Sequence, residues 1–521
     1  MQKSFIPAAF AFRASAPKCL VLFPAVFAIL MRKPYFALLL LASCHVLDKE
    51  PLTTIAPSNF FKSATDAEAS LTAAYDGLQT KGCYAEVLNL VGNMPSDDCS
   101  SSNNDVRVLD DLNWNSATGQ VYDVYRDNFR AINRANAVIK YVPGVSMPAA
   151  RRDQIVGEAR FIRGLCYFNL VRLYGAVPVR LEPTESGDPA VLNLPRTSPD
   201  QVYARVVEDL TVAAGAMADV NFARATKGSA NALLGRVQLT QRNWAAAKEA
   251  ADRVLSGKGN YSLLGFNALY PADNKAESIF EVQFSGNTDG NTFFTLPDIV
   301  MPSPPATYSF PKFNIPTLFV TGNAARSTDL TAVVDTVNDR RWSYQGRVAA
   351  GRNHASYVDG RSGNANDRGP FVWKWRSDGN GFNSTDNYYV LRLAEVYLTA
   401  AEASNELASP ATAVLGYLNP IRQRAGLPLL TAASPEAASQ PTLRAEIDKQ
   451  RRLELAFEGE RWFDLLRYAR HEQASGAARH AVTALDLIAQ KRGARDVNYL
   501  QFPIPLAELN TNTQLQQNPG Y

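Results

Sequence analysis

The chain has 521 residues, of which 46% are hydrophobic and 20% are charged, and its 53 basic and 50 acidic side chains leave a formal charge of +3. This balance is ordinary for a globular protein, and it argues against nucleic-acid binding, which normally shows as a clustered basic face. The length is sufficient to bury a large core without disulfides or structural metal ions.

The first predicted element is an export signal that ends at residue 43. Arg32 and Lys33 precede a run of eight apolar residues, Tyr35 to Ala42, and small residues then lead to a cleavage point. Such a run is too short for a membrane-spanning helix, which needs about 20 residues. Because another apolar run lies before Met31, we expect Met31 to be the true start of the protein.

A lipid anchor is predicted at Cys44. The sequence Leu41-Ala42-Ser43-Cys44 resembles a bacterial lipobox, which implies that Cys44 is acylated and becomes the first residue of the mature protein. Two or more acyl chains give stable membrane anchoring. Residues 44–57 would then be the anchor and its tether. The alternative is an ordinary signal peptide with an accidental cysteine.

Helical periodicity dominates from about residue 58 onward. The clearest case is 149–174, where Ile155, Ala159 and Ile162 fall on one stripe and Gly175 supplies a C-cap. In the helix pair at 226–256, the Ala-rich segment Asn243 to Val254 resembles one tetratricopeptide-type unit, and such hairpins must stack on neighbours to bury their apolar faces. The pattern predicts helices over 66–79, 119–141, 149–174, 226–241, 243–256, 387–407, 410–425, 441–469 and 478–490.

Two stretches interrupt this pattern. Residues 82–118 are rich in Gly, Pro, Asp, Ser and Asn, which predicts a loop. Residues 260–385 lose helical periodicity apart from one alternating segment, Glu277 to Phe284, that predicts a strand. Because helices both precede and follow this irregular insert, we expect one large domain over 58–521 rather than two.

Candidate catalytic and metal-binding residues have simpler explanations. The predicted helix over 441–469 carries six carboxylates, and paired carboxylates can hydrolyse glycosidic bonds. Ion pairs with neighbouring arginines and packing at the helix end are the better explanation for them. The four histidines show no zinc spacing, and acidic loops at 97–98 and 287–290 are better read as solvated turns than as calcium sites. The sequence therefore predicts no catalytic residue, no metal and no cofactor.

Cys83 and Cys99 could pair in an oxidising compartment, or both could remain unpaired.

Aromatic side chains in the two irregular stretches indicate ligand binding. Aromatic rings offer apolar faces to sugar rings, and a few polar groups can then fix the orientation of the ligand. Any one of these aromatics could instead anchor its loop on the scaffold. The predicted ligand-binding residues are Asn93, Asp97, Asp98, Trp114, Phe293, Phe294, Tyr308, Trp342 and Tyr344.

Several segments together resemble the SusD-like (RagB/SusD) family, in the same order from the tether to the last residue. They are Leu47–Leu52, Tyr125–Asn136, Glu158–Leu165, Arg172–Pro178, Tyr389–Leu398, Ile421–Leu427, Glu454–Arg467 and Pro503–Tyr521.

The resemblance implies a mainly α fold, in which a tetratricopeptide-like scaffold of helical hairpins supports a large irregular, loop-rich insert with a few short strands. It also implies a lipoprotein of the bacterial outer membrane, facing the cell surface, that binds oligosaccharides or related nutrients. The implied partner is a SusC-like TonB-dependent transporter. A structural scaffold without a ligand and a glycoside hydrolase are the alternatives.

Overall fold

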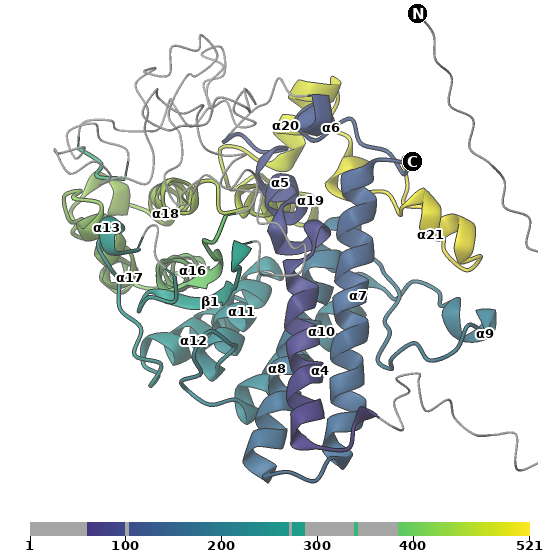
Figure 1. Cartoon of the computed structure of the whole chain (residues 1–521). Helices are drawn as coiled ribbons and strands as arrows, with labels where there is room; N and C mark the ends of the chain where they lie inside the picture. The colour runs from purple at the N-terminus through teal and green to yellow at the C-terminus, as the bar shows by residue number, and fades with distance from the viewer. Residues whose placement is uncertain (1–59, 99–103, 270–272, 287–337, 342–383) are drawn as a thin grey trace, which may run out of the picture. The chain divides into compact units, whose positions relative to one another are not determined.

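Helices form most of the part of the chain that the computed structural model describes, which comprises residues 60–98, 104–269, 273–286, 338–341 and 384–521 (Figure 1). Residues Phe61–Tyr521 form one compact unit. The mainly α fold expected from the sequence is confirmed. None of the helices in the described ranges is both long enough and apolar enough to cross a membrane.

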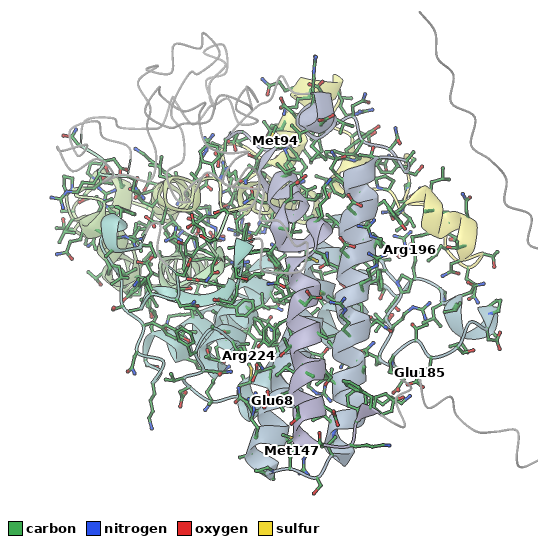
Figure 2. All side chains as sticks on the ribbon, in the orientation of Figure 1. Glu68, Met94, Met147, Glu185, Arg196 and Arg224 are labelled. Atoms are coloured by element: carbon green, nitrogen blue, oxygen red, sulfur yellow. The ribbon has the colours of Figure 1, made fainter. Side chains whose placement is uncertain are left out.

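Three long helices open this unit: α4 (Ala64–Asp76), α7 (Gly119–Tyr141) and α8 (Ala149–Tyr174). A capping box starts α4, in which Ser63 Oγ accepts a hydrogen bond from the Asp66 backbone N–H at 3.3 Å. Glu68 of α4 pairs with Arg151 at 2.6 Å and with Arg224 at 3.5 Å (Figure 2). The predicted helix over 149–174 is confirmed, and Gly175 ends it with a positive φ of 70°.

The middle of the chain continues as a series of helices in which each packs on the one before it. These helices are α10 (Pro199–Ala216), α11 (Lys227–Thr240), α12 (Trp244–Leu255), α16 (Leu393–Glu406) and α17 (Ala411–Arg424). α8 contacts α7 and α10, α11 contacts α10 and α12, α12 contacts α16, and α16 contacts α17. This repeated packing of neighbouring helices is the tetratricopeptide-like scaffold that the sequence predicts.

The C-terminal part differs from its prediction, because the single helix expected over 441–469 is two helices. α18 (Gln440–Leu455) and α19 (Arg461–Ser475) are separated by a turn in which Phe457 has a φ of 65° and Gly459 a φ of 83°. A Cβ on Gly459 would lie 2.7 Å from Tyr388 Oη, so the close approach of Tyr388 also favours glycine here. α20 (Ala484–Arg492) and α21 (Leu506–Thr511) follow.

The described residues contain one two-stranded antiparallel sheet, made of β1 (Ser278–Val282) and β2 (Tyr388–Arg392). The strand expected near 277–284 is confirmed. The helix expected over 387–407 begins only at Leu393, because Tyr388–Arg392 pairs with a strand more than a hundred residues earlier in the chain. Such a distant partner is invisible to a local periodicity.

The stretch over 82–118 is more ordered than the predicted loop. A π-helical turn (Lys81–Ala85), α5 (Val87–Asn93) and α6 (Asn104–Asp110) lie within or across it. Leu88, Leu90 and Val91 are buried, so apolar packing keeps α5 helical despite the polar residues that follow it. The remaining short elements are Gly77–Gln79, Val142–Gly144, α9 (Pro189–Leu192), α13 (Phe266–Leu269), Pro435–Ala437 and Val497–Leu500.

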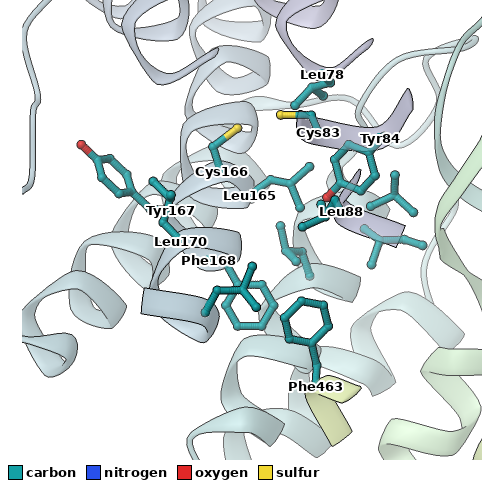
Figure 3. Close-up of a cluster of buried hydrophobic side chains, with 14 of the residues drawn as sticks. Leu78, Cys83, Tyr84, Leu88, Leu165, Cys166, Tyr167, Phe168, Leu170 and Phe463 are labelled. Carbon is teal, nitrogen blue, oxygen red and sulfur yellow. The ribbon is translucent and has the colours of Figure 1, made fainter. Parts of the chain in front are cut away.

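A large hydrophobic core joins α5, α8 and α19. Figure 3 shows Leu88, Leu165, Phe168 and Phe463 in this cluster, with the two free thiols of Cys83 and Cys166 buried beside them. Burial raises the pKa of the Cys83 thiol to about 12. Cys83 is unpaired in the structure, which agrees with the second of the two alternatives that the sequence allowed, and Cys99 lies outside the described residues.

Candidate functional site

The described ends of the irregular insert meet at the small sheet. β1 lies near the start of the insert and β2 follows its end, and Val282 lies opposite Tyr388 in the strand pair. Asn387 closes the junction, because its Oδ1 accepts from the Phe284 backbone N–H and its Nδ2 donates to Glu281 Oε2, both at 2.9 Å. The chain therefore leaves and rejoins the scaffold at one place, which we call the insert base (Ser278–Phe284 and Asn387–Arg392).

A buried cluster of opposite charges lies under the insert base. Arg392, 2% exposed, ends β2 and donates to three carboxylates. Its guanidinium reaches Glu277 at 3.1 Å, Glu454 at 2.7 Å and Glu458 at 2.7 Å. Arg424 of α17 pairs with Glu277 and Glu454 as well. Removing one partner from such a buried set leaves an uncompensated charge, which costs about 3–5 kcal/mol.

A short stretch within the insert, residues 338–341, is fixed to the same cluster. Arg341 is 1% exposed, and its guanidinium donates to Asp339 at 2.6 Å and to Gln450 Oε1 at 2.8 Å. It also lies 3.4 Å from Glu454. The Arg340 backbone N–H donates to the Ala425 carbonyl at 2.8 Å. The insert is therefore tied to α17 and α18 at this stretch as well as at its base.

Three predicted ligand-binding residues, Asn93, Asp97 and Asp98, are buried in contacts with the turn between α18 and α19 and with the arginines beside it. Asn93 donates to the Phe457 carbonyl at 3.1 Å. Asp97 accepts from Arg461 at 2.8 Å, and Asp98 accepts from Arg452 at 2.7 Å. Their positions do not support contact with a ligand from an open loop.

Burial and charge pairing oppose each other at the two aspartates. Burial disfavours the charged form of Asp97, but Arg452 and Arg461 outweigh it and hold the pKa of this carboxyl below its usual range. For Asp98 burial outweighs the attraction of Arg452, and the pKa is raised. Both carboxyls serve to fix the residues that precede 99–103 against α18 and α19.

Trp114, the fourth predicted contact in the first irregular stretch, is a core residue. It is 2% exposed, and its Nε1–H donates to Tyr521 Oη at 2.7 Å. Its ring lies 4.8 Å from that of Phe502, centroid to centroid. This is the loop-anchoring role that the sequence left open as an alternative. The remaining predicted residues, Cys44, Phe293, Phe294, Tyr308, Trp342 and Tyr344, lie outside the described residues.

The six carboxylates weighed as catalytic candidates are all held by arginines. In Asp464, burial disfavours ionisation, but Arg451 and Arg467 outweigh it and lower the pKa to about 2. Across the described ranges, no three His, Cys, Asp or Glu side chains gather where they could hold a metal ion. The pairs are Glu446 with Arg422, Asp448 with Arg461, Glu454 and Glu458 with Arg392, Glu460 with Arg236, and Asp464 with Arg451.

The sequence did not single out Arg392, Arg341 or Tyr388, although these residues organise the insert base. Tyr388 Oη donates to the Glu458 carbonyl at 2.8 Å and accepts from Asn89 at 3.0 Å. The one available signal was Arg392, a charged residue directly after the apolar run Tyr388–Leu391. If that run is a buried strand, the charged side chain at its end needs ion-pair partners.

Comparison with known proteins identifies the scaffold. The family model described as "SusD family" matches residues 311–521, and the one described as "Starch-binding associating with outer membrane" matches residues 47–239. Together they span both the N-terminal helices and the C-terminal half of the chain.

Individual relatives agree over nearly the whole length. SusD-like protein P2 of Formosa agariphila is 26% identical over 515 residues, covering 93% of this chain and 98% of that protein. The starch-binding protein SusD of Bacteroides thetaiotaomicron is 25% identical over 513 residues, covering 84% of this chain and 86% of that protein. A solved laminarin-binding SusD-like protein has a TM-score of 0.68 at 28% identity, covering 88% of this chain and 100% of that one. The chain belongs to the SusD-like (RagB/SusD) family.

Proposed function

We propose that this protein captures an oligosaccharide at the bacterial cell surface and delivers it to a SusC-like TonB-dependent transporter in the outer membrane. The observation that carries the proposal is the buried arginine–carboxylate cluster around Arg392 and Arg341, which fixes the insert to a rigid helical scaffold at several points. Loops held on a rigid scaffold are common places for binding residues.

The aromatic residues of the insert are the proposed ligand contacts: Phe293, Phe294, Tyr308, Trp342 and Tyr344. Their rings suit the apolar faces of sugars. Fixing the base of the insert in the free protein lowers the ordering cost of binding, which favours affinity. Asn93, Asp97, Asp98 and Trp114 are buried in the scaffold and are not part of the proposed contact set.

Two neutral glucans are the first ligands to test. One relative is named as starch-binding and another as laminarin-binding, and both polymers are built of glucose. Each described acidic side chain of α18–α19 that could have served in hydrolysis is paired with an arginine, which favours capture over catalysis.

Lipid anchoring at Cys44 places the protein at the membrane in this proposal. A Cys44→Ala variant, expressed with its export signal in a bacterium that lipidates its outer-membrane proteins, is expected to leave the membrane fraction. Unchanged membrane retention would contradict the anchor. A transporter of the proposed class should co-purify with the lipidated protein after mild detergent extraction.

The decisive experiment is native electrophoresis of the chain from His45 onward in gels containing starch, laminarin and a wider panel of polysaccharides, with a reducing-sugar assay on the same mixtures. Retardation by a glycan without new reducing ends is the expected result. New reducing ends would indicate a hydrolase. No retardation across the panel would favour the scaffold without a ligand.

Substitutions at Trp342 test whether this residue contacts the polysaccharide. Trp342→Ala is expected to abolish retardation, whereas Trp342→Phe keeps an aromatic face and should retain most of it. Phe222→Ala is the matched control, because Phe222 is an exposed aromatic on the scaffold, 83% accessible. Equal retardation of the Trp342→Ala and Phe222→Ala variants would remove Trp342 from the proposed site.

A further inference from the structure

A groove with a mixed polar and apolar lining lies on the side of α7 where α9 and α21 are found, whereas β1 lies on the other side of α7 (Figure 1). Its volume is about 610 Å³, and its walls come from α7, from the connection between α8 and α10, and from α21. This size lies within the range of about 300–1,000 Å³ that is usual for small-ligand sites. Tyr125, Phe129, Asn133, Arg180 and Glu508 line it.

The hydroxyl of Tyr125 lacks a partner in this groove. Tyr125 is 3% exposed, and its ring lies 4.8 Å from Phe129 and 5.1 Å from Tyr174, centroid to centroid. No group in the described part of the chain forms a hydrogen bond with its hydroxyl. The ring is buried, whereas Tyr125 lines the open groove, so an incoming polar group can form a hydrogen bond with its hydroxyl.

Two further polar groups are open in the same groove. Asn133 Oδ1 accepts from the Thr184 backbone N–H at 2.7 Å, and its Nδ2 has no partner among the described residues. The partly buried carboxylate of Glu508 likewise forms no hydrogen bond or ion pair within those ranges. Burial raises the pKa of Glu508, and Arg180 is the charged neighbour that opposes this shift. The groove thus offers both a donor and an acceptor beside aromatic carbon.

The other arginines of the groove are already neutralised, which argues against an anionic ligand. Arg126 pairs with Asp127 at 2.7 Å and with Asp123 at 3.0 Å, Arg130 pairs with Asp127 at 3.3 Å, and Arg134 pairs with Asp76. A ligand that both donates and accepts, and that carries an apolar C–H face, fits the remaining groups. Sugar hydroxyls and ring faces have this chemistry.

We propose that this groove binds a single sugar residue, with the Tyr125 hydroxyl, the Asn133 amide and the Glu508 carboxylate bonding to its hydroxyls and Phe129 contacting its apolar face. It would be a second saccharide site, separate from the insert, and it extends the proposed function from one contact point to two. Two sites on one polymer raise the overall affinity through effective concentration.

The test is ligand-detected NMR of the chain without its export signal, using D-glucose, D-galactose, D-mannose and N-acetyl-D-glucosamine as probes. The Trp342→Ala background is used so that the insert contributes little signal. Tyr125→Phe and Glu508→Gln are each expected to weaken binding of the responding sugar about tenfold, the usual effect of losing one strong hydrogen bond.

Matched controls keep the result interpretable. Tyr499→Phe and Glu436→Gln alter a tyrosine and a glutamate that line no part of this groove and have no side-chain hydrogen bond or ion pair in the described ranges. They should leave sugar binding unchanged. Because the Tyr125 hydroxyl and the Glu508 carboxylate have no partner within the described protein, neither groove variant should lower the melting temperature.

Two results would overturn the groove site: equal binding by groove and control variants, or no signal from any of the four sugars. The outcome is separable from that of the proposed function, because polysaccharide retardation depends on Trp342 and the NMR signal does not. Retardation without a groove-dependent signal would leave the insert as the site and would remove the groove.

Discussion

Helices α8 and α18 belong to one scaffold but differ in how much of their buried surface is charged. α8 buries mainly apolar residues such as Ile155 and Ile162 against its neighbours, with a few ion pairs such as Arg163 with Asp209. α18 instead buries charged residues, including Arg451, Arg452 and Glu454, and each has a partner elsewhere in the fold. Apolar burial is non-directional and tolerates repacking, whereas a buried charge depends on one particular partner. The helix beneath the insert is therefore placed by specific pairs.

The largest effect is expected from removing Arg392 of the buried charge cluster. Arg392→Met leaves Glu277, Glu454 and Glu458 without their central cation, and we expect the free energy of unfolding to fall by about 4 kcal/mol. Urea unfolding followed by circular dichroism measures this loss. Arg392→Lys keeps the charge and should lose less. A loss below that of a surface arginine variant would show that Arg392 does not hold the insert base.

The apolar side of the comparison is tested at Leu165, which is fully buried in the core cluster. Leu165→Ala removes packed methyl groups and leaves a cavity, so stability should fall by about 3 kcal/mol. Leu165→Met keeps the volume and should cost less than about 1.5 kcal/mol. In contrast to Arg392→Met, both values should be nearly independent of pH between neutral and mildly acidic conditions.

Lowering the pH should reduce the stability of the folded protein, because Asp464 becomes protonated and loses its ion pairs. Its pKa falls from the ordinary value of 3.8 to about 2 in the folded protein. A depressed folded pKa stabilises the protein above the unfolded pKa, and this contribution, about 2 kcal/mol, is lost as pH falls from about 4 to about 2. The stability gap between the wild type and Asp464→Asn should narrow over this window. A constant gap would contradict the assigned pairing with Arg451 and Arg467.

The smallest effect is expected for an arginine pair on the surface. Arg253 is 49% exposed and lies 2.6 Å from Glu249 one helical turn earlier. Arg253→Ala should cost no more than about 0.5 kcal/mol, because solvent screens such pairs. This variant is also the control for Arg392→Met, since both remove one guanidinium. A large loss of stability in Arg253→Ala would mean that burial does not distinguish strong arginine pairs from weak ones.

Local pattern was sufficient where apolar contacts decide the structure. The stripe through Ile155, Ala159 and Ile162, with Gly175 after it, predicted α8 to the residue. The local pattern failed where a segment far away in the sequence decides the secondary structure. Tyr388–Arg392 carries no local sign that it pairs with Ser278–Val282, and the segment through Phe457 and Gly459 reads as helix until Tyr388 and Asn93 are seen against it.

The candidate site shows the same limit. Polar residues in a predicted loop suggested ligand contacts at Asp97 and Asp98, yet they pair with Arg461 and Arg452, some 350 residues later in the chain. Tyr125 and Glu508, which line the proposed groove, are separated by more than 380 residues. No spacing rule connects such residues.

The sequence by itself determined the helical scaffold, the position of the insert and the family, because periodicity and ordered motifs are local properties of the chain. The tertiary structure alone decided which polar side chains are buried partners and which remain open in a groove. The physical reason is that a charge or hydroxyl becomes structural or available only through what surrounds it, and those surroundings are assembled from segments far apart in sequence.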